Sequence, residues 1–142
     1  MSAIAKAAGT GMGTIYNYFE TKETLINSIY VDIKYQQEVL IQALGAEASV
    51  KEQYEQYYRA ITNFYLDNPA CYRFMDQLQG SPIITEESKR SGEKAIAPIK
   101  KLFQQGQQEG LIKPMNTEEL LQFTGGTVLA YLGWRLNSNR PE

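Results

Sequence analysis

Apolar residues recur at helical spacing along almost the whole chain, and strand-like alternation is not sustained over any useful length. The clearest stripe is aromatic and has the spacing of one helix face. It consists of Tyr54, Tyr57, Tyr58, Ile61, Phe64 and Tyr65. A second stripe predicts a long helix over 22–44 and consists of Leu25, Ile26, Ile29, Ile33, Leu40 and Leu44. The pattern therefore predicts an all-α protein.

Glycine, proline and capping residues divide this pattern into separate helices. Besides the long one, we expect helices over 2–8, 12–19, 69–78, 85–109 and 117–136, and one that begins after position 49. The residues expected to cap or end them are Gly9, Thr21, Gly45, Ser49, Asn68, Gly110 and Asn116. Pro98 should kink or split the helix over 85–109, because proline lacks a backbone N–H.

The composition narrows the chemistry that these helices can carry. The chain has 142 residues, 43% of them hydrophobic and 21% charged, a net charge of −2, no histidine and one cysteine. These counts exclude an internal disulfide, a Cys/His zinc cluster and any triad with a histidine base. We predict no catalytic residue, cofactor or metal site, and no enzyme. No apolar run is long enough for a membrane span and no signal peptide is visible, so a cytoplasmic protein without membrane contact is expected.

Two short helices joined by a glycine turn and followed by a long helix are the ingredients of a helix-turn-helix. Residues 4–19 read I-A-K-A-A-G-T-G-M-G-T-I-Y-N-Y-F, and T-K-E-T-L-I follows at 21–26. This string resembles the TetR/AcrR family of bacterial transcriptional regulators, which reads roughly I-A-x-x-A-G-V-S-x-G-T-x-Y-x-Y-F-x-x-K-x-x-L. The resemblance implies a homodimeric repressor that binds double-stranded operator DNA and is released by a small-molecule inducer.

The second short helix would be the one that reads DNA. Met12, Thr14 and Asn17 are candidates for base contacts, since asparagine can pair with adenine and methyl groups can contact thymine. Gly13 would let the backbone approach the groove. By family analogy, the contacts to phosphate are made by Tyr16, Tyr18 and Lys22. The residues interpreted instead as the core of the small domain are Ile4, Ala8, Ile15 and Phe19.

The chain departs from the family pattern in two respects. Gly11 stands where members usually have a polar cap, and the family places a further basic helix before this motif. Over residues 1–35 the acidic and basic residues balance. We therefore expect an incomplete helix-turn-helix domain at 1–33, with its first helix absent, and a ligand-binding and dimerisation domain at 34–142. The last three residues, 140–142, resemble the start of another helix or a frayed tail.

The middle helices could enclose the inducer, as the resemblance implies. The candidate ligand residues are Tyr57, Tyr58, Phe64, Tyr65, Tyr72, Phe74, Met75 and Phe103, although an ordinary core explains the same pattern. The last helix is apolar on two sides and carries two adjacent glycines, which favours a dimer seam. The candidate dimer residues are Ile99, Phe103, Gly125, Gly126, Val128, Leu132 and Trp134. The alternative function is a dimeric helical ligand-binding or interaction module without DNA-binding activity.

Overall fold

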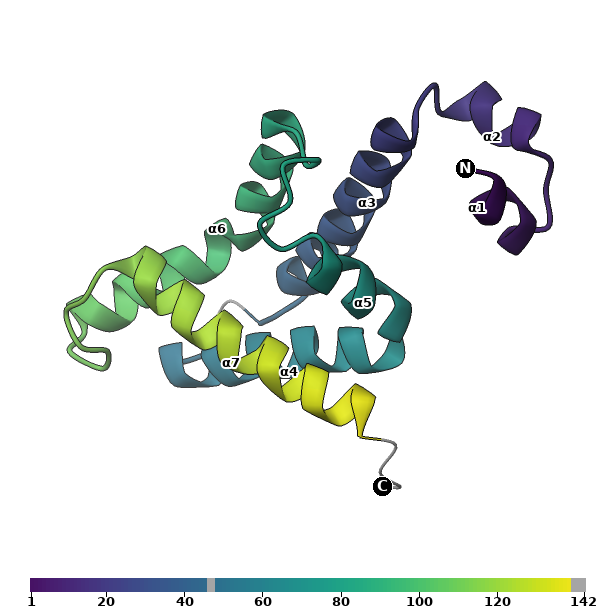
Figure 1. Cartoon of the computed structure of the whole chain (residues 1–142). Helices are drawn as coiled ribbons and strands as arrows, with labels where there is room; N and C mark the ends of the chain where they lie inside the picture. The colour runs from purple at the N-terminus through teal and green to yellow at the C-terminus, as the bar shows by residue number, and fades with distance from the viewer. Residues whose placement is uncertain (46–47, 139–142) are drawn as a thin grey trace.

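The described residues of the computed structural model, 1–45 and 48–138, form helices joined by short connections (Figure 1). In chain order the helices are α1 (Ser2–Ala7), α2 (Met12–Tyr18), α3 (Lys22–Gln42), α4 (Val50–Asp67), α5 (Pro69–Gln77), α6 (Glu86–Gln108) and α7 (Thr117–Asn137). No strand occurs within these residues, so the all-α prediction is confirmed. The expectation for positions 140–142 lies outside the described residues.

Several helix ends form as their sequence signals predict. Gly9 has a φ of +65° and lies in a Schellman turn, in which the N–H of Gly9 donates to the carbonyl of Lys6 and the N–H of Thr10 to that of Ala5. Gly110, with a φ of +71°, ends α6 in the same way. Thr21 caps α3 in a capping box whose second member is Thr24. This cap fixes the start of the long helix directly behind the helix-turn-helix.

Two expected signals act differently from the prediction. Asn68 stands at the start of α5, but its side-chain amide donates backwards to the carbonyl of Phe64 at 2.9 Å and so closes α4. Gly45 does not adopt the left-handed conformation, and α3 already ends at Gln42. Ser49 with Glu52 forms the expected capping box.

The buried face of α3 is shifted relative to the predicted stripe. Leu25 and Ile33 are buried as expected, whereas Leu40 is exposed and its neighbour Ile41 is buried. Gln37 is also buried, one turn before Ile41, so that a polar residue occupies the middle of the core face. The stripe counted apolar residues only, and for that reason it missed this position.

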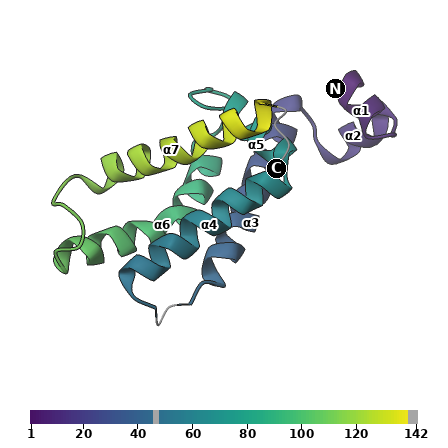
Figure 2. The same ribbon diagram turned by 90° about the horizontal axis from the view of Figure 1, so that it is seen from below.

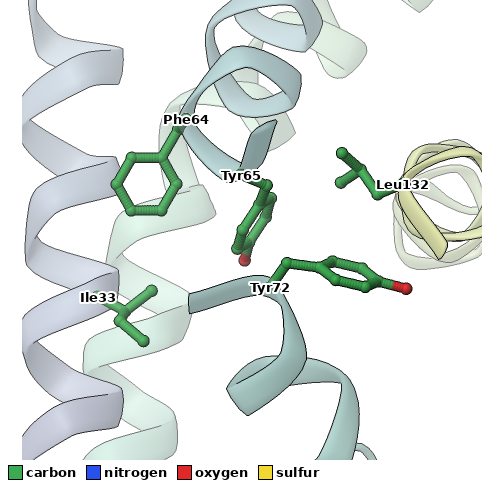
Figure 3. Packing of buried hydrophobic residues seen from close by; sticks show 5 residues of the cluster. All are labelled: Ile33, Phe64, Tyr65, Tyr72 and Leu132. Carbon is green, nitrogen blue, oxygen red and sulfur yellow. The ribbon is translucent and has the colours of Figure 1, made fainter. Parts of the chain in front are cut away.

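The core of the larger domain has two clusters. One contains Ile33, Phe64, Tyr65, Tyr72 and Leu132, where α3, α4, α5 and α7 meet (Figure 3). Leu132 has no exposed surface at all. The other contains Val50, Ile99, Leu102 and Phe103 and joins α4 to α6. Together the clusters hold α3, α4, α6 and α7 around a common centre.

The helix α6 stays continuous through Pro98, so the proline does not split it, and its ribbon changes direction along its length (Figures 1 and 2). Its first half lies very close to α3. A Cβ atom on Gly92 would come within 2.5 Å of the Tyr30 hydroxyl, so that a larger residue there would have to displace the Tyr30 side chain. This close approach couples α6 to the long helix.

The helices α1 and α2 lie apart from the others, at the N-terminal end of α3 (Figures 1 and 2). Ala5 is their one buried residue within the described chain, Ile15 and Phe19 are half-buried, and Ile4 and Ala8 are exposed. The prediction that Ile4 and Ala8 lie in the core of the small domain is therefore wrong. Two helices of six and seven residues do not offer enough surface to cover them.

Candidate nucleic-acid interface and ligand cavity

The helix α2 presents nearly all its side chains outward. It has no buried residue, and only Ile15 is half-covered. Met12, Thr14 and Asn17 are exposed, and a Cβ on Gly13 would meet no atom of the described chain within 4 Å apart from its chain neighbours and the backbone of α2 itself. The candidate base-reading residues therefore line a helix surface that nothing in the described chain blocks.

The candidate phosphate contacts lie at the C-terminal end of α2 and the start of α3. Tyr18 is 79% exposed, and Tyr16 and Lys22 are exposed as well. Lys22 is the first residue of α3, where the backbone N–H groups have no partner inside the helix. Glu23 lies next to it and partly offsets the positive charge of this helix start. The predicted positions are thus all accessible to a ligand.

A cavity of about 180 Å³ lies between α3, α4, α6 and α7. Three of the predicted ligand residues, Tyr57, Tyr58 and Tyr65, line it from α4. Sequence reasoning missed the remaining lining residues, which are Lys34, Gln37, Ile41, Ile61, Ala95, Ile96, Leu121, Gln122, Gly125, Val128 and Leu129. Polar residues on the buried face of α3, at positions 34 and 37, are the sequence signal that could have indicated it.

The tyrosine hydroxyls of the cavity differ in their hydrogen bonds. The Tyr58 hydroxyl donates to Oγ1 of Thr124 at 2.5 Å, and this Oγ1 donates to the carbonyl of Leu120 at 2.6 Å. Burial raises the pKa of Tyr58 to about 12, and the bond to Thr124 partly opposes the shift. Burial also raises the pKa of Tyr65 to about 12, against a hydrogen bond with Gln37. Both phenols are therefore neutral at physiological pH.

Lys34 brings a cation to the same cavity. Burial lowers the pKa of its ammonium group. Its Nζ lies 3.5 Å from Oε1 of Gln37 and 5.7 Å from the centre of the Tyr30 ring. Lys34 belongs to α3, the helix that continues back to the helix-turn-helix. A ligand in the cavity would therefore touch this long helix directly.

The other predicted ligand residues do not line this cavity. Phe64 and Tyr72 belong to the core cluster around Leu132, and Phe74 and Met75 pack against that cluster. Phe103 lines a different pocket of about 380 Å³ between α4, α6 and α7. That pocket contains no residue of α3. Apolar spacing alone could not separate core from cavity, because both require the same residue types.

The predicted dimer residues fall into two groups. Ile99, Phe103 and Leu132 are fully buried in the core of one chain and present no surface to a second one. Gly126 and Trp134 are exposed on α7, whereas Gly125 and Val128 line the cavity. The outward side of α7 also exposes three large aromatic residues, Phe123, Tyr131 and Trp134. Phe123, which is 73% exposed, was missed because it falls outside both apolar faces of the sequence pattern.

One connection that the sequence did not reveal joins α3 to α6. The side-chain amide of Asn27 donates to the carbonyls of Glu23 and Ile83, at 2.9 and 2.8 Å, and its oxygen accepts from the N–H of Thr85 at 2.9 Å. Thr85 is the residue that caps α6. A single side chain therefore ties the first turns of α3 to the start of α6.

Comparison with known proteins finds two family models along this chain. The model described as "Bacterial regulatory proteins, tetR family" matches residues 1–29, and the one described as "Tetracyclin repressor-like, C-terminal domain" matches residues 49–131. None of the helices in the described part of the chain is both long and apolar enough to cross a membrane.

Solved structures share the fold over nearly the whole chain. A protein of Marinobacter aquaeolei VT8 described as a TetR family transcription regulator has 25% identity and a TM-score of 0.83, over 96% of this chain and 72% of its own. A protein of Shewanella sp. PV-4, with a similar description, has 24% identity and a TM-score of 0.81, over 96% and 74%. One from Vibrio parahaemolyticus has 23% identity and a TM-score of 0.71, over 99% and 76%.

Proposed function

Because the chain belongs to the TetR family of bacterial transcription regulators, we propose that it is a repressor that reads operator DNA with α2 and is released by a small molecule in the cavity between α3, α4, α6 and α7. The single observation that carries this proposal is that one helix, α3, connects the DNA-reading helix α2 to the cavity. Three residues separate the end of α2 from the start of the unbroken helix α3, which lines the cavity with Lys34, Gln37 and Ile41.

We place the boundary between the two domains inside α3, with a DNA-reading part at 1–33 and a ligand-binding and dimerisation part at 34–142. The first cavity residue of the helix, Lys34, lies twelve positions beyond Lys22. At 1.5 Å per residue these two positions are about 18 Å apart along the helix. A ligand that tilts α3 at the cavity would displace α2 at the far end of the same rigid rod.

The larger pocket of about 380 Å³ is a weaker candidate for the inducer site, because it has no contact with α3. A ligand can shift a conformational equilibrium only if it binds the two conformations unequally. A ligand that touches α3 would distinguish two positions of this helix, and one that touches only α4, α6 and α7 would do so indirectly. This argument favours the smaller, central cavity.

We further propose a two-fold dimer through the outward side of α7. Phe123, Tyr131 and Trp134 are large exposed apolar residues on this helix, and the rings of Tyr131 and Trp134 lie 6.1 Å apart. An exposed apolar patch of this kind is typical of a protein interface. A two-fold dimer would present two copies of α2 to successive major grooves, about 34 Å apart.

The DNA part of the proposal is tested by selecting duplexes from a random pool with the full chain and measuring affinity by fluorescence anisotropy. Asn17→Ala should weaken binding by about 1–3 kcal/mol and relax specificity at one base pair. Lys22→Gln should weaken binding to all sequences equally and lower the salt dependence by about one counterion.

Matched controls are available on the bundle. Asn63→Ala and Lys101→Gln change the same residue types at exposed positions of α4 and α6 and should leave DNA affinity unchanged. If selection enriches no duplex, or if the α2 variants bind as tightly as the controls, the repressor proposal is refuted. A chain that then still dimerises and binds small molecules is the interaction module considered above.

A further inference from the structure

The described lining of the cavity between α3, α4, α6 and α7 contains a cation but no carboxylate. Of the described residues that line it, Lys34 alone has a charged side chain. The polar lining residues are two glutamines and three tyrosines, and one of these tyrosines, Tyr58, is hydrogen-bonded to Thr124. The remaining lining residues are apolar or glycine. A positively charged ligand would meet a cation there and no carboxylate, which disfavours amines.

The charge of Lys34 is not neutralised by an ion pair within the described chain. The two nearest acidic residues in sequence have other partners, since Glu38 lies 4.0 Å from Lys94 and Asp32 accepts a hydrogen bond from Gln36 at 2.7 Å. Lys34 is left with the Gln37 amide oxygen at 3.5 Å and the face of Tyr30. Taking a cation out of water without a counter-charge is costly, so the site gains when an anion enters.

A second donor lines the same cavity as this cation. The Tyr58 hydroxyl is bonded to Thr124 and that of Tyr65 interacts with Gln37, whereas the Tyr57 hydroxyl has no hydrogen bond in the described part of the structure. Tyr57 lines the cavity, and its neutral phenol can donate one hydrogen bond to an acceptor. A lysine and a free phenol are donors of the kind that the two oxygens of a carboxylate accept.

We propose that the effector is a small amphipathic carboxylic acid whose carboxylate binds Lys34 and Tyr57 and whose hydrocarbon body packs on Ile41, Ile61, Ile96 and Leu121. The inference rests on the proposed function, in that the cavity is taken as the effector site. The volume of about 180 Å³ is below the roughly 300–1,000 Å³ of pockets for drug-sized ligands, which indicates a compact molecule. The anion would sit against α3 itself and so pull on the helix that carries α2.

The test compares three probes that share one hydrocarbon chain: octanoate, octanamide and octylamine. Binding to the full chain is measured by isothermal titration calorimetry and by thermal shift. Octanoate should bind at least about tenfold more tightly than octanamide, because a charge-assisted hydrogen bond replaces a neutral one. Octylamine should not bind measurably. Equal affinity for acid and amide, a preference for the amine, or binding of none of the three overturns the proposal.

Variants separate a direct contact from a structural role. Lys34→Met should reduce the preference for octanoate over octanamide to less than about threefold while octanamide still binds. Lys101→Met, a change of the same type at an exposed position of α6, should leave the preference intact. Tyr57→Phe should weaken octanoate more than octanamide. Gly125→Leu, which keeps Lys34 but extends a side chain into open space, should abolish binding of both probes. Undiminished octanoate binding by Lys34→Met overturns the proposal.

The same probes distinguish this inference from the proposed function. If octanamide or octylamine, but not octanoate, releases the chain from its selected duplex, the repressor proposal stands and the carboxylate inference fails. If octanoate binds through Lys34 without any effect on DNA binding, the carboxylate inference stands and the proposed regulation fails.

Discussion

The adjacent glycines of α7 allow a matched test of the proposed dimer. Both lie inside the helix, and apart from its chain neighbours and the adjoining backbone of α7, neither has an atom of the described chain within 4 Å of the position where a Cβ would stand. They differ in direction, since Gly125 lines the cavity between α3, α4, α6 and α7 and Gly126 is exposed on the outer surface. Alanine at either site therefore gains helix propensity without a clash inside one chain.

The expected magnitudes follow from this geometry. Gly125→Ala should stabilise the protein by about 1 kcal/mol, the usual difference between glycine and alanine in a helix interior. For a chain of 142 residues this corresponds to a rise in Tm of about 3–5 °C. Gly126→Ala should lack this gain, because in the proposed dimer its methyl group would separate two closely packed copies of α7.

The assay combines thermal unfolding with sedimentation equilibrium over a range of protein concentrations. We expect Gly126→Ala to raise the dimer dissociation constant by about tenfold, or about 1.4 kcal/mol, and Gly125→Ala to leave it unchanged. If both variants are stabilised equally and associate as the parent does, no second chain lies close to Gly126. The reasoning for a seam at this position is then refuted.

Two further predictions concern the core and the cavity. Leu132→Ala should lower the free energy of unfolding by about 2–5 kcal/mol, because Leu132 has no exposed surface. Val39→Ala, at an exposed position of α3, should change it by less than about 0.5 kcal/mol. Urea unfolding measures both variants, and similar losses would contradict the packing described. Because burial raises the pKa values of Tyr58 and Tyr65 to about 12 from 10.0, the unfolded chain should release these protons first as the pH rises from 10 to 12. Stability should therefore fall over this range by up to about 1.4 kcal/mol per pH unit for each tyrosine, and unfolding curves that coincide at pH 10 and 12 would be the contrary result.

The sequence predicted those features that depend on neighbouring residues. The left-handed turn at Gly9, the cap at Thr21 and the box of Ser49 with Glu52 are all local, and each forms as its spacing indicates. The bend of α6, which contains Pro98, is expected in the same way from one missing N–H. The helix-turn-helix could be located from the string around Gly13 because its fold is set by such short-range signals.

The cavity could be predicted only in part, because its lining depends on which helix faces meet in space. Tyr57 and Tyr72 are both aromatic residues at helical spacing, yet one lines the cavity and the other fills the core. Lys34 and Gln37 were missed because a search for apolar periodicity passes over polar residues on a buried face. The bonds of Asn27 join groups 56 and 58 positions apart, and no local pattern encodes such a pair.

The hydrogen bonds of Asn27 determine how a displacement is transmitted between α3 and α6. Its amide holds a backbone carbonyl of α3 itself, a carbonyl in the loop before α6 and the N–H of the residue that caps α6. Aspartate lacks the donor and leucine lacks both groups, so neither could maintain the joint. The first turns of α3 are thereby joined to α6. We therefore expect α3 and α6 to move as one rigid unit, which carries the short helices α1 and α2 at the N-terminal end of α3 (Figure 2).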